Sequence, residues 1–443
     1  MLKPKALLCL LAAFAIVAFG VATSQSAFAN TSTSRSASAS LSSSSQTFVS
    51  FSQFLTNVAN ARYSDYAGRA PASVQNEQAF GAMRSYILDT YAGVKQVSSF
   101  VLDGQYFDCI TINSQSSVHH LNIKQIAQPP KVSIPTASGS STQASGSPLT
   151  LGQKDEFGNS ISCKDGTIPM ERITLEKMVQ FPTLQAFLAK SPGDQAATNA
   201  HRYAIGYQSV TNYGGNSWLN LWNPSGNFSL SQQWYVGGSG SGTQTVEGGW
   251  IHYPGKFGKR SVLFIYWTAN DYQSTGCYNL DCTAFVQTNN NWALGGAFTN
   301  YSSYGGTQWG FTLQWKYYQG NWWLFLQGSG SIQAVGYYPG SIYRGGPLSK
   351  KSSLIEYGGE TYTPTTNWPQ MGSGKFASAG WQKAAFQKTI FYIPNNQSGG
   401  TGVWATLSPL QTNPKCYTII ITPSSSGGSW GTYFYFGGPG GYC

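Results

Sequence analysis

Two segments of this chain place glutamates beside glycine pairs where other charges are scarce. The first is Thr245–Pro254 (Thr-Val-Glu-Gly-Gly-Trp-Ile-His-Tyr-Pro), which carries Glu247 and has no basic neighbour until Lys256. A carboxylate that is buried without a partner costs free energy, and its pKa rises, so Glu247 is a candidate for acid–base chemistry. The alternative is an ordinary strand residue that is solvated or hydrogen-bonded to a neighbouring strand.

The second segment is Ser353–Tyr362, in which Glu356 and Glu360 flank Tyr-Gly-Gly. Side chains alternate along a strand, so both glutamates are expected on one face, roughly 13 Å apart, and only one can approach Glu247 closely. The glycines next to the glutamates would let a ligand backbone come close. Two facing glutamates titrate as a coupled pair, in which one activates water and the other donates a proton.

Other catalytic chemistries find little support in the sequence. On a regular strand His252 points away from Glu247, and neither it nor His201 has an evident carboxylate partner for a Ser-His-Asp triad. The four histidines are too dispersed for a zinc site, and there is no cofactor signature. We therefore expect neither a metal nor a cofactor.

The composition indicates an exported β-protein. Only 9% of the 443 residues are charged and 15% are aromatic, so aromatic side chains build the core while uncharged polar residues face water. The net charge of +10 arises from few acidic residues, and the basic residues are scattered. This distribution does not favour binding to nucleic acid.

The first 29 residues have the pattern of a secretory signal peptide. Lys3 and Lys5 precede an apolar run, and Ala27-Phe28-Ala29 is a typical cleavage site. We expect a secreted protein, cleaved near Ala29, that has no membrane contact afterwards. Cleavage leaves an even set of cysteines, which favours disulfides in an exported chain. The members are Cys109, Cys163, Cys277, Cys282, Cys416 and Cys443.

The cysteine spacing suggests which residues pair. Cys277 with Cys282 and Cys416 with Cys443 are close in sequence, which would leave Cys109 with Cys163. The sequence alone does not fix this connectivity.

The chain divides into a mixed N-terminal part and a β-rich C-terminal part. Residues 30–50 form a Ser-rich linker, residues 51–97 and 174–189 have helical periodicity, and 100–112 alternates as a strand. The stretch 190–199 has small polar residues without periodicity, so it is a plausible domain boundary and an exposed proteolysis site.

From His201 onward short strands alternate with Gly-rich turns, which predicts about fourteen strands. Beyond those starting near Tyr203, Trp218 and Phe228, we expect strands at 245–253, 262–268, 282–288, 292–298, 308–317, 321–328, 352–362, 386–393, 402–407, 416–421 and 431–436. The expected fold class is all-β: an antiparallel β-sandwich of two curved, stacked sheets, jelly-roll or concanavalin-like, with a smaller α+β N-terminal domain.

Several motifs in order resemble the neprosin family of secreted glutamic peptidases. In the N-terminal part they are Asp108-Cys-Ile110, His120-Leu121 and Cys163-Lys-Asp-Gly-Thr-Ile-Pro-Met-Glu-Arg172. In the C-terminal part they are Phe228–Trp234, Val246–Trp250, Tyr266–Thr268, Gly276–Cys282, Ile355–Glu360, Gln370–Gly374 and Tyr433–Gly440. The similarity spans nearly the whole mature chain. This chain departs from the family at Tyr357, where members commonly have Trp, and at Lys164, where they have Pro.

The resemblance implies a β-sandwich peptidase of residues 200–443 whose catalytic glutamates are Glu247 and Glu356. Glu360 then takes a supporting role, or is the alternative catalytic residue. It further implies an N-terminal activation domain, residues 51–199, that inhibits the enzyme intramolecularly and is removed in acid. Protein or peptide substrates would be cleaved, with proline as a favoured neighbour of the cleaved bond.

Two other functions stay open from the residues alone. Paired carboxylates on an aromatic, concave sandwich also suit a glycoside hydrolase. A non-catalytic carbohydrate-binding module would use the same surface without turnover. Both would need exposed aromatic rings as stacking platforms, for which the candidates are Trp218, Trp222, Trp250, Trp267 and Trp315.

Overall fold

The computed structural model describes residues 47–135, 153–191 and 201–443, and from Phe48 onward these form one compact unit. The expected signal peptide, most of the Ser-rich linker and the stretch 192–200 lie outside the described residues. Among the described residues, no helix is both long enough and apolar enough to cross a membrane.

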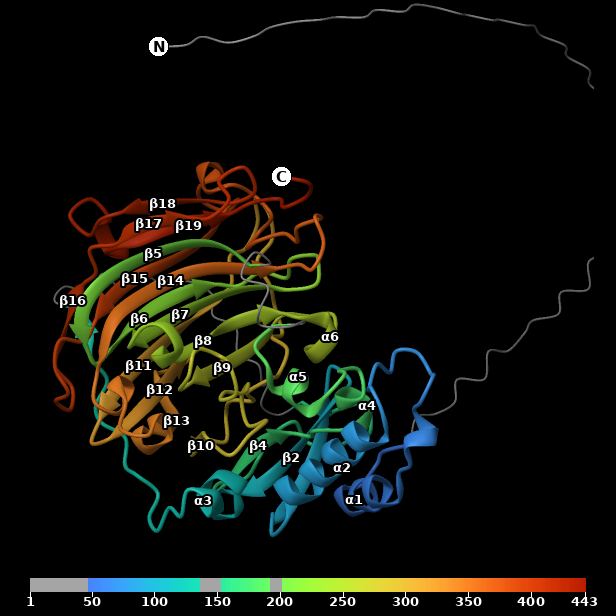
Figure 1. Cartoon of the computed structure of the whole chain (residues 1–443). Helices are drawn as coiled ribbons and strands as arrows, with labels where there is room; N and C mark the ends of the chain where they lie inside the picture. The colour runs from blue at the N-terminus through green and yellow to red at the C-terminus, as the bar shows by residue number, and fades with distance from the viewer. Residues whose placement is uncertain (1–46, 136–152, 192–200) are drawn as a thin grey trace, which may run out of the picture. The chain divides into compact units, whose positions relative to one another are not determined.

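Most regular structure after residue 200 is β-strand, as Figure 1 shows. The strands are β5 (His201–Asn212), β6 (Gly214–Asn220), β7 (Ser229–Gly237), β8 (Gln244–His252), β9 (Val262–Thr268), β10 (Val286–Gln287), β11 (Gly310–Tyr318), β12 (Asn321–Gln327), β13 (Gln333–Pro339), β14 (Ser352–Tyr362), β15 (Ala385–Tyr392), β16 (Thr401–Trp404), β17 (Ser408–Gln411), β18 (Thr418–Thr422) and β19 (Tyr433–Gly437). A short helix, α6 (Pro254–Phe257), follows β8.

Two curved sheets are stacked on each other in this part of the chain (Figure 1). One has six strands in the order β17-β5-β14-β7-β8-β9, all paired antiparallel. The other has ten strands and includes β6, β11, β12 and β15. The expected antiparallel β-sandwich with a small α+β N-terminal part is confirmed.

Alternation along the strands separates the two faces of the six-stranded sheet. Tyr235 and Tyr357 point inward, where their hydroxyls lie 3.1 Å apart in the core between the sheets. Trp250 and Trp315 are fully buried in the same core. The residues next to them along the strands, such as Trp234 beside Tyr235 and Glu356 beside Tyr357, therefore point to the outer face.

Within the N-terminal region, of which residues 48–135 and 153–191 are described, apolar side chains of the helices pack against that outer face, while β3 (Ile134–Pro135) pairs with β16 of the ten-stranded sheet. The helices of this region are α1 (Phe51–Asn60), α2 (Glu77–Tyr91), α3 (Ser116–His120), α4 (Leu175–Met178) and α5 (Leu184–Leu188), and its other strands are β1 (Gln96–Leu102), β2 (Gln105–Thr111) and β4 (Thr167–Glu171). Apolar side chains such as Phe54, Met83 and Phe187 join one hydrophobic cluster with Leu230 and Ile251 of the sandwich. Burial of this apolar surface holds the region in place.

Several expected elements were wrong in detail. No strand covers 292–298, where the chain makes turns and a single bridge from Ala297 to Val262. The helix expected over 174–189 is split into α4 and α5, because Pro182 lies between them and cannot donate a helical hydrogen bond. Strands β13 and β17 were not expected.

Candidate active site

Strand register places Glu356 and Glu247 in one row on the outer face of the six-stranded sheet. Glu356 of β14 is paired with Trp234 of β7, and Trp234 is paired with Glu247 of β8. Cross-strand partners point to the same face, and neighbouring strands lie about 4.8 Å apart. The two glutamates therefore stand on either side of Trp234, about two strand spacings apart.

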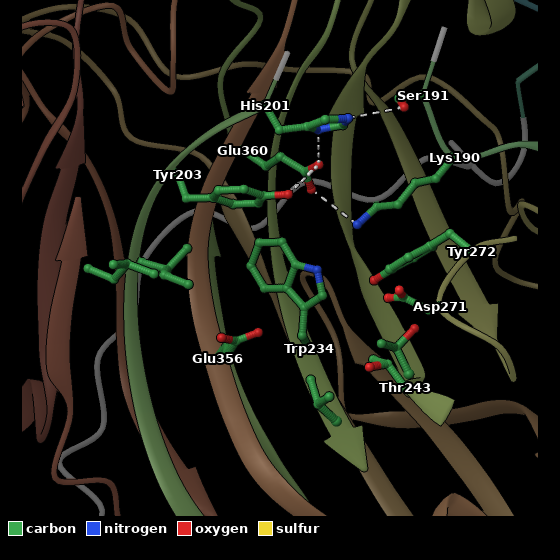
Figure 2. A pocket seen from close by; sticks show the side chains of 14 residues that line it. Lys190, Ser191, His201, Tyr203, Trp234, Thr243, Asp271, Tyr272, Glu356 and Glu360 are labelled. Atoms are coloured by element: carbon green, nitrogen blue, oxygen red, sulfur yellow. Dashed lines mark hydrogen bonds and ion pairs between the residues drawn. The ribbon is translucent and has the colours of Figure 1, made fainter. Parts of the chain in front are cut away.

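A pocket of about 430 Å³ opens on this row. Figure 2 shows its lining, with Glu356 beside Trp234 and with Lys190 and Tyr272 beyond the ring. The full lining is Lys190, Ser191, His201, Tyr203, Ile205, Trp234, Val236, Thr243, Thr245, Asp271, Tyr272, Glu356, Glu360 and Leu410. Glu247 is fully buried and lies behind Lys190, Thr245 and Tyr272, all of which contact it.

Both oxygens of Glu247 have partners. Oε1 accepts hydrogen bonds from the Thr245 hydroxyl at 2.7 Å and from the Tyr272 hydroxyl at 2.6 Å. Oε2 accepts one from Gln232 Nε2 at 2.9 Å and forms an ion pair with Lys190 Nζ at 2.6 Å. The expectation of an unpaired carboxylate was wrong, because the cation comes from a distant part of the sequence. Hydrogen bonds of this kind stabilise the ionised form of a carboxyl group.

Glu356 has the opposite environment. It is partly buried, and its carboxyl group has no hydrogen-bond or ion-pair partner within the described residues. Burial, followed by the charge of Glu247, raises the pKa of Glu356 to about 7, although Lys190 acts in the other direction. Glu356 is therefore protonated in acid, when it can donate a proton.

Glu360 forms a third, separately paired carboxylate. Its oxygens lie 3.1 Å from Lys190 Nζ and 2.7 Å from His201 Nδ1. Burial alone would raise the pKa of Glu360, but Lys190 and His201 outweigh it and lower the pKa to about 2. Glu360 is thus a permanent anion except in strong acid. It shares Lys190 with Glu247, whereas Glu356 shares the strand row with Glu247.

Lys190 is a site residue that the sequence did not indicate. Its ammonium is buried between Glu247 and Glu360, and it lies 5.2 Å from the ring centre of Trp234. Burial lowers the pKa of Lys190, but the two carboxylates more than reverse this and raise it. Lys190 follows an amphipathic segment and precedes Ser-Pro-Gly, so no local pattern links it to residue 247.

The backbone around Lys190 is fastened to the sandwich. The carbonyl of Phe187 accepts a hydrogen bond from Lys256 Nζ at 2.7 Å, and the carbonyl of Leu188 accepts one from the Tyr266 hydroxyl at 3.3 Å. The Tyr278 hydroxyl donates to the carbonyl of Lys190 itself. These contacts hold the lysine side chain in the pocket.

Two of the glycines beside the glutamates, Gly248 and Gly359, serve packing, so for these two the expected approach of a ligand was wrong. A Cβ atom on Gly248 would lie 3.0 Å from Leu313 of the opposite sheet, and one on Gly359 would lie 2.7 Å from Met371 Sδ. Both glycines therefore face the core, where they let the two sheets come close together.

The remaining candidates lie outside the site. The five tryptophans considered as stacking platforms are all at most 9% exposed, so they belong to the core. His252 is buried and lies near Asn223 Oδ1, at 3.2 Å. No group of three or more His, Cys, Asp or Glu side chains within the described ranges is arranged to hold a metal ion.

The six cysteines form three disulfides in the structure. They join Cys109 to Cys163, Cys277 to Cys282, and Cys416 to Cys443, the pairs suggested by the spacing. The second of these lies in the segment between β9 and β10.

A hydrogen-bonded, ion-paired carboxyl group and an unpaired carboxyl group of raised pKa, held in one row beside a pocket, are the two kinds of group that general acid–base chemistry requires. Residues 225–439 match the family model Neprosin, so this part of the chain is a Neprosin domain, and the resemblance is confirmed for these residues. The match contains both Glu247 and Glu356, and it supports a peptidase. Among solved structures, the chain is similar to a scytalido-glutamic peptidase crystallised with a transition state analog inhibitor. That similarity has 10% identity and a TM-score of 0.29, covers 54% of this chain and 97% of the other, and is too remote to carry an argument.

Proposed function

We propose that this protein is a secreted, acid-active glutamic endopeptidase that is made as a zymogen. The observation that carries the proposal is the Glu247–Trp234–Glu356 row in a Neprosin domain, with one glutamate fully paired and the other unpaired. The different surroundings assign different roles to the two carboxyl groups.

In this mechanism Glu247 is the general base and Glu356 is the general acid. Glu247 takes a proton from a water molecule whose oxygen attacks the peptide carbonyl carbon. Glu356 donates its proton to the carbonyl oxygen, which gives a neutral tetrahedral diol. When the C–N bond breaks, the leaving nitrogen receives the proton held by Glu247, and Glu356 regains its own from a hydroxyl group of the diol.

The proposed zymogen state rests on Lys190. Its ammonium is paired with Glu247 and lies between this carboxylate and the pocket, where it would keep the attacking water away from the base. Activation would cut the chain within residues 192–200. The activation domain, proposed as residues 51–199, would then leave residues 200–443 as the mature enzyme.

Acid would favour release of Lys190. The pKa of Glu360 is lowered from 4.5 to about 2, so its ion pairs stabilise the docked state fully above pH 4.5. This stabilisation is lost progressively as the pH falls towards 2. Glu356, with its pKa of about 7, is already protonated in that range and ready to act as the acid.

Substrate preference and location complete the proposal. The pocket wall next to Glu356 is formed partly by Tyr203, Ile205, Val236 and Leu410, which suits a compact apolar residue such as proline. Three disulfides are typical of an exported protein, which agrees with a signal peptide over residues 1–29.

The test is acid incubation of the purified full chain with a denatured protein and, separately, with a panel of polysaccharides. We expect the chain to shorten by its N-terminal region below about pH 5 and then to digest the protein at internal bonds. Release of sugars with intact protein substrate would instead identify a glycoside hydrolase. Binding of a glycan without turnover of either substrate would identify a binding module.

A further inference from the structure

The loop between β9 and β10 has an unusual backbone directly beside the pocket. Asp271 and Tyr272 are consecutive non-glycine residues with φ angles of 55° and 59°. Side chains with a Cβ atom rarely adopt this left-handed conformation, and such residues persist only where the surrounding structure enforces them. Strained residues of this kind concentrate at functional sites.

A network of hydrogen bonds enforces this conformation. The Asp271 N–H donates to the carbonyl of Thr243 at 2.8 Å, and the Tyr272 N–H donates to the Thr268 hydroxyl at 2.9 Å. The Asn270 side chain accepts from the N–H and the hydroxyl of Thr275, at 3.1 and 2.6 Å, which closes the loop. The loop therefore presents Tyr272 in one orientation.

That orientation directs the Tyr272 hydroxyl onto the base. The hydroxyl donates to Glu247 Oε1 at 2.6 Å, and the ring lines the pocket (Figure 2). Burial, followed by the charge of Glu247, raises the pKa of Tyr272 well above its ordinary value. The phenol is consequently a neutral donor at every pH at which the enzyme would work.

The two carboxylate oxygens of Glu247 therefore have different hydrogen-bond partners. Oε1 is occupied by Tyr272 and Thr245, while Oε2 accepts from Gln232 and faces the Lys190 ammonium. The ammonium lies on the pocket side, where a water molecule would bind once Lys190 has left. A hydroxyl group at Oε1 therefore leaves Oε2 as the oxygen that receives the proton.

We propose that Tyr272 is a positioning residue that holds Glu247 through Oε1 and directs Oε2 towards the attacking water, at the place now taken by the Lys190 ammonium. This inference rests on the proposed function, because it assumes that Glu247 is the base. It adds a residue that the sequence analysis did not identify, and it assigns the strained Asp271–Tyr272 turn to catalysis.

The test compares Tyr272→Phe with wild type as full chains that carry an engineered protease site within residues 192–200. Maturation then does not depend on the enzyme's own activity. Tyr417→Phe is the matched control, since its buried hydroxyl also donates at 2.6 Å, but to the backbone carbonyl of Pro369, away from the pocket.

The titratable groups that face Glu247 are Glu356, Glu360, Tyr203, Tyr266, Tyr278, Tyr338 and Tyr343, and Lys190 before its release. All of these stay constant between the variants.

For Tyr272→Phe we expect kcat to fall about 100-fold, the lower end for loss of one preorganised donor, with KM within about threefold of wild type. Loss of this hydrogen-bond donor to the base should move the acid limb of the kcat profile to higher pH by about one unit. Tyr417→Phe should change neither kcat nor the limb. A fall in kcat at unchanged limb position would mean a merely structural role and would overturn the inference.

A second readout separates this inference from the proposed function. Titration of Glu247 by carbon-13 NMR, in wild type and in Tyr272→Phe, measures the positioning effect without any turnover. If Glu247→Gln keeps its activity, the proposed function fails, and the positioning role of Tyr272 fails with it. If Glu247→Gln is inert while Tyr272→Phe leaves rate and titration unchanged, only the positioning role fails.

Discussion

Lys190 Nζ lies 2.6 Å from Glu247 Oε2, and the two residues come from opposite sides of the proposed cleavage segment. The ammonium also reaches Glu360 Oε2 at 3.1 Å. One side chain of the N-terminal region thus provides the cation for two buried carboxylates of the sandwich. Because a buried charge is stable only when it is paired, docking of the N-terminal region and the state of the site are linked.

Replacing Lys190 with Met should let the N-terminal region leave the pocket at a higher pH than in wild type. The variant leaves Glu247 and Glu360 without their shared cation, which weakens docking of the N-terminal region. We expect self-processing to begin at least one pH unit higher than in wild type, as followed by electrophoresis between pH 3 and 7. Lys164→Met, at an exposed position of the same region, is the control. An unchanged onset would show that Lys190 does not restrain the enzyme.

Glu360→Gln should reduce the pH dependence of docking. Glu360 has its pKa lowered to about 2, so its contribution to stability is present above pH 4.5 and lost as the pH falls towards 2. In a Glu356→Gln background, which is expected not to cut itself, the melting temperature of the full chain should drop at pH 6 and change little at pH 2. Equal losses at both pH values would contradict this assignment.

Glu356→Gln should make the protein more stable at high pH. The pKa of Glu356 is raised from 4.5 to about 7, so the folded protein binds an extra proton between these values, and stability falls as the pH rises through them. The uncharged glutamine removes this loss, which we put at about 1–3 kcal/mol. Urea unfolding at pH 5 and pH 8 measures it, with the exposed Glu156→Gln as control. No gain at pH 8 would mean that Glu356 ionises normally.

The buried pair Asp108–Arg172 should control the stability of the N-terminal region. Arg172 Nε and one terminal nitrogen lie 2.9 and 2.6 Å from the two oxygens of Asp108. Asp108→Ala leaves the guanidinium buried and unpaired, which costs about 3–5 kcal/mol. Limited proteolysis near neutral pH should then degrade this region faster than in wild type. The double variant Asp108→Leu/Arg172→Met should recover part of the loss, whereas an equal or larger loss would argue against a buried charge as the cause.

The sequence predicted the long strands well because their local pattern is strong. The expected strand 352–362 coincides with β14, and the expected strand 262–268 coincides with β9. The second is a run of apolar, aromatic and β-branched residues, which favours a buried strand. The segment 292–298 was wrong because Trp292, Ala293 and Leu294 are buried in turns, so their apolar character reports burial and not a strand.

The site was predictable only in part, for a physical reason. Glu247 and Glu356 stand out as isolated carboxylates in apolar strands, and alternation places each on a face. The two glutamates share a row because β8 and β14 each pair with β7 in a register that places both opposite Trp234. No local sequence pattern encodes that register. Lys190 and Tyr272 reach Glu247 through tertiary contacts alone. The sequence therefore did not indicate the residues that pair with Glu247.

The most direct test of the account measures turnover by Glu247→Gln, Glu356→Gln and Glu360→Gln. Each variant carries an engineered protease site within residues 192–200, so that all mature equally. With a peptide substrate in acid, we predict that the first two lose at least about a thousandfold in kcat, because either loss removes one half of the acid–base pair. Glu360→Gln should keep at least about a hundredfold more activity than either. Substantial activity in Glu247→Gln or Glu356→Gln, or an inert Glu360→Gln beside an active Glu356→Gln, would contradict the assignment of the catalytic pair.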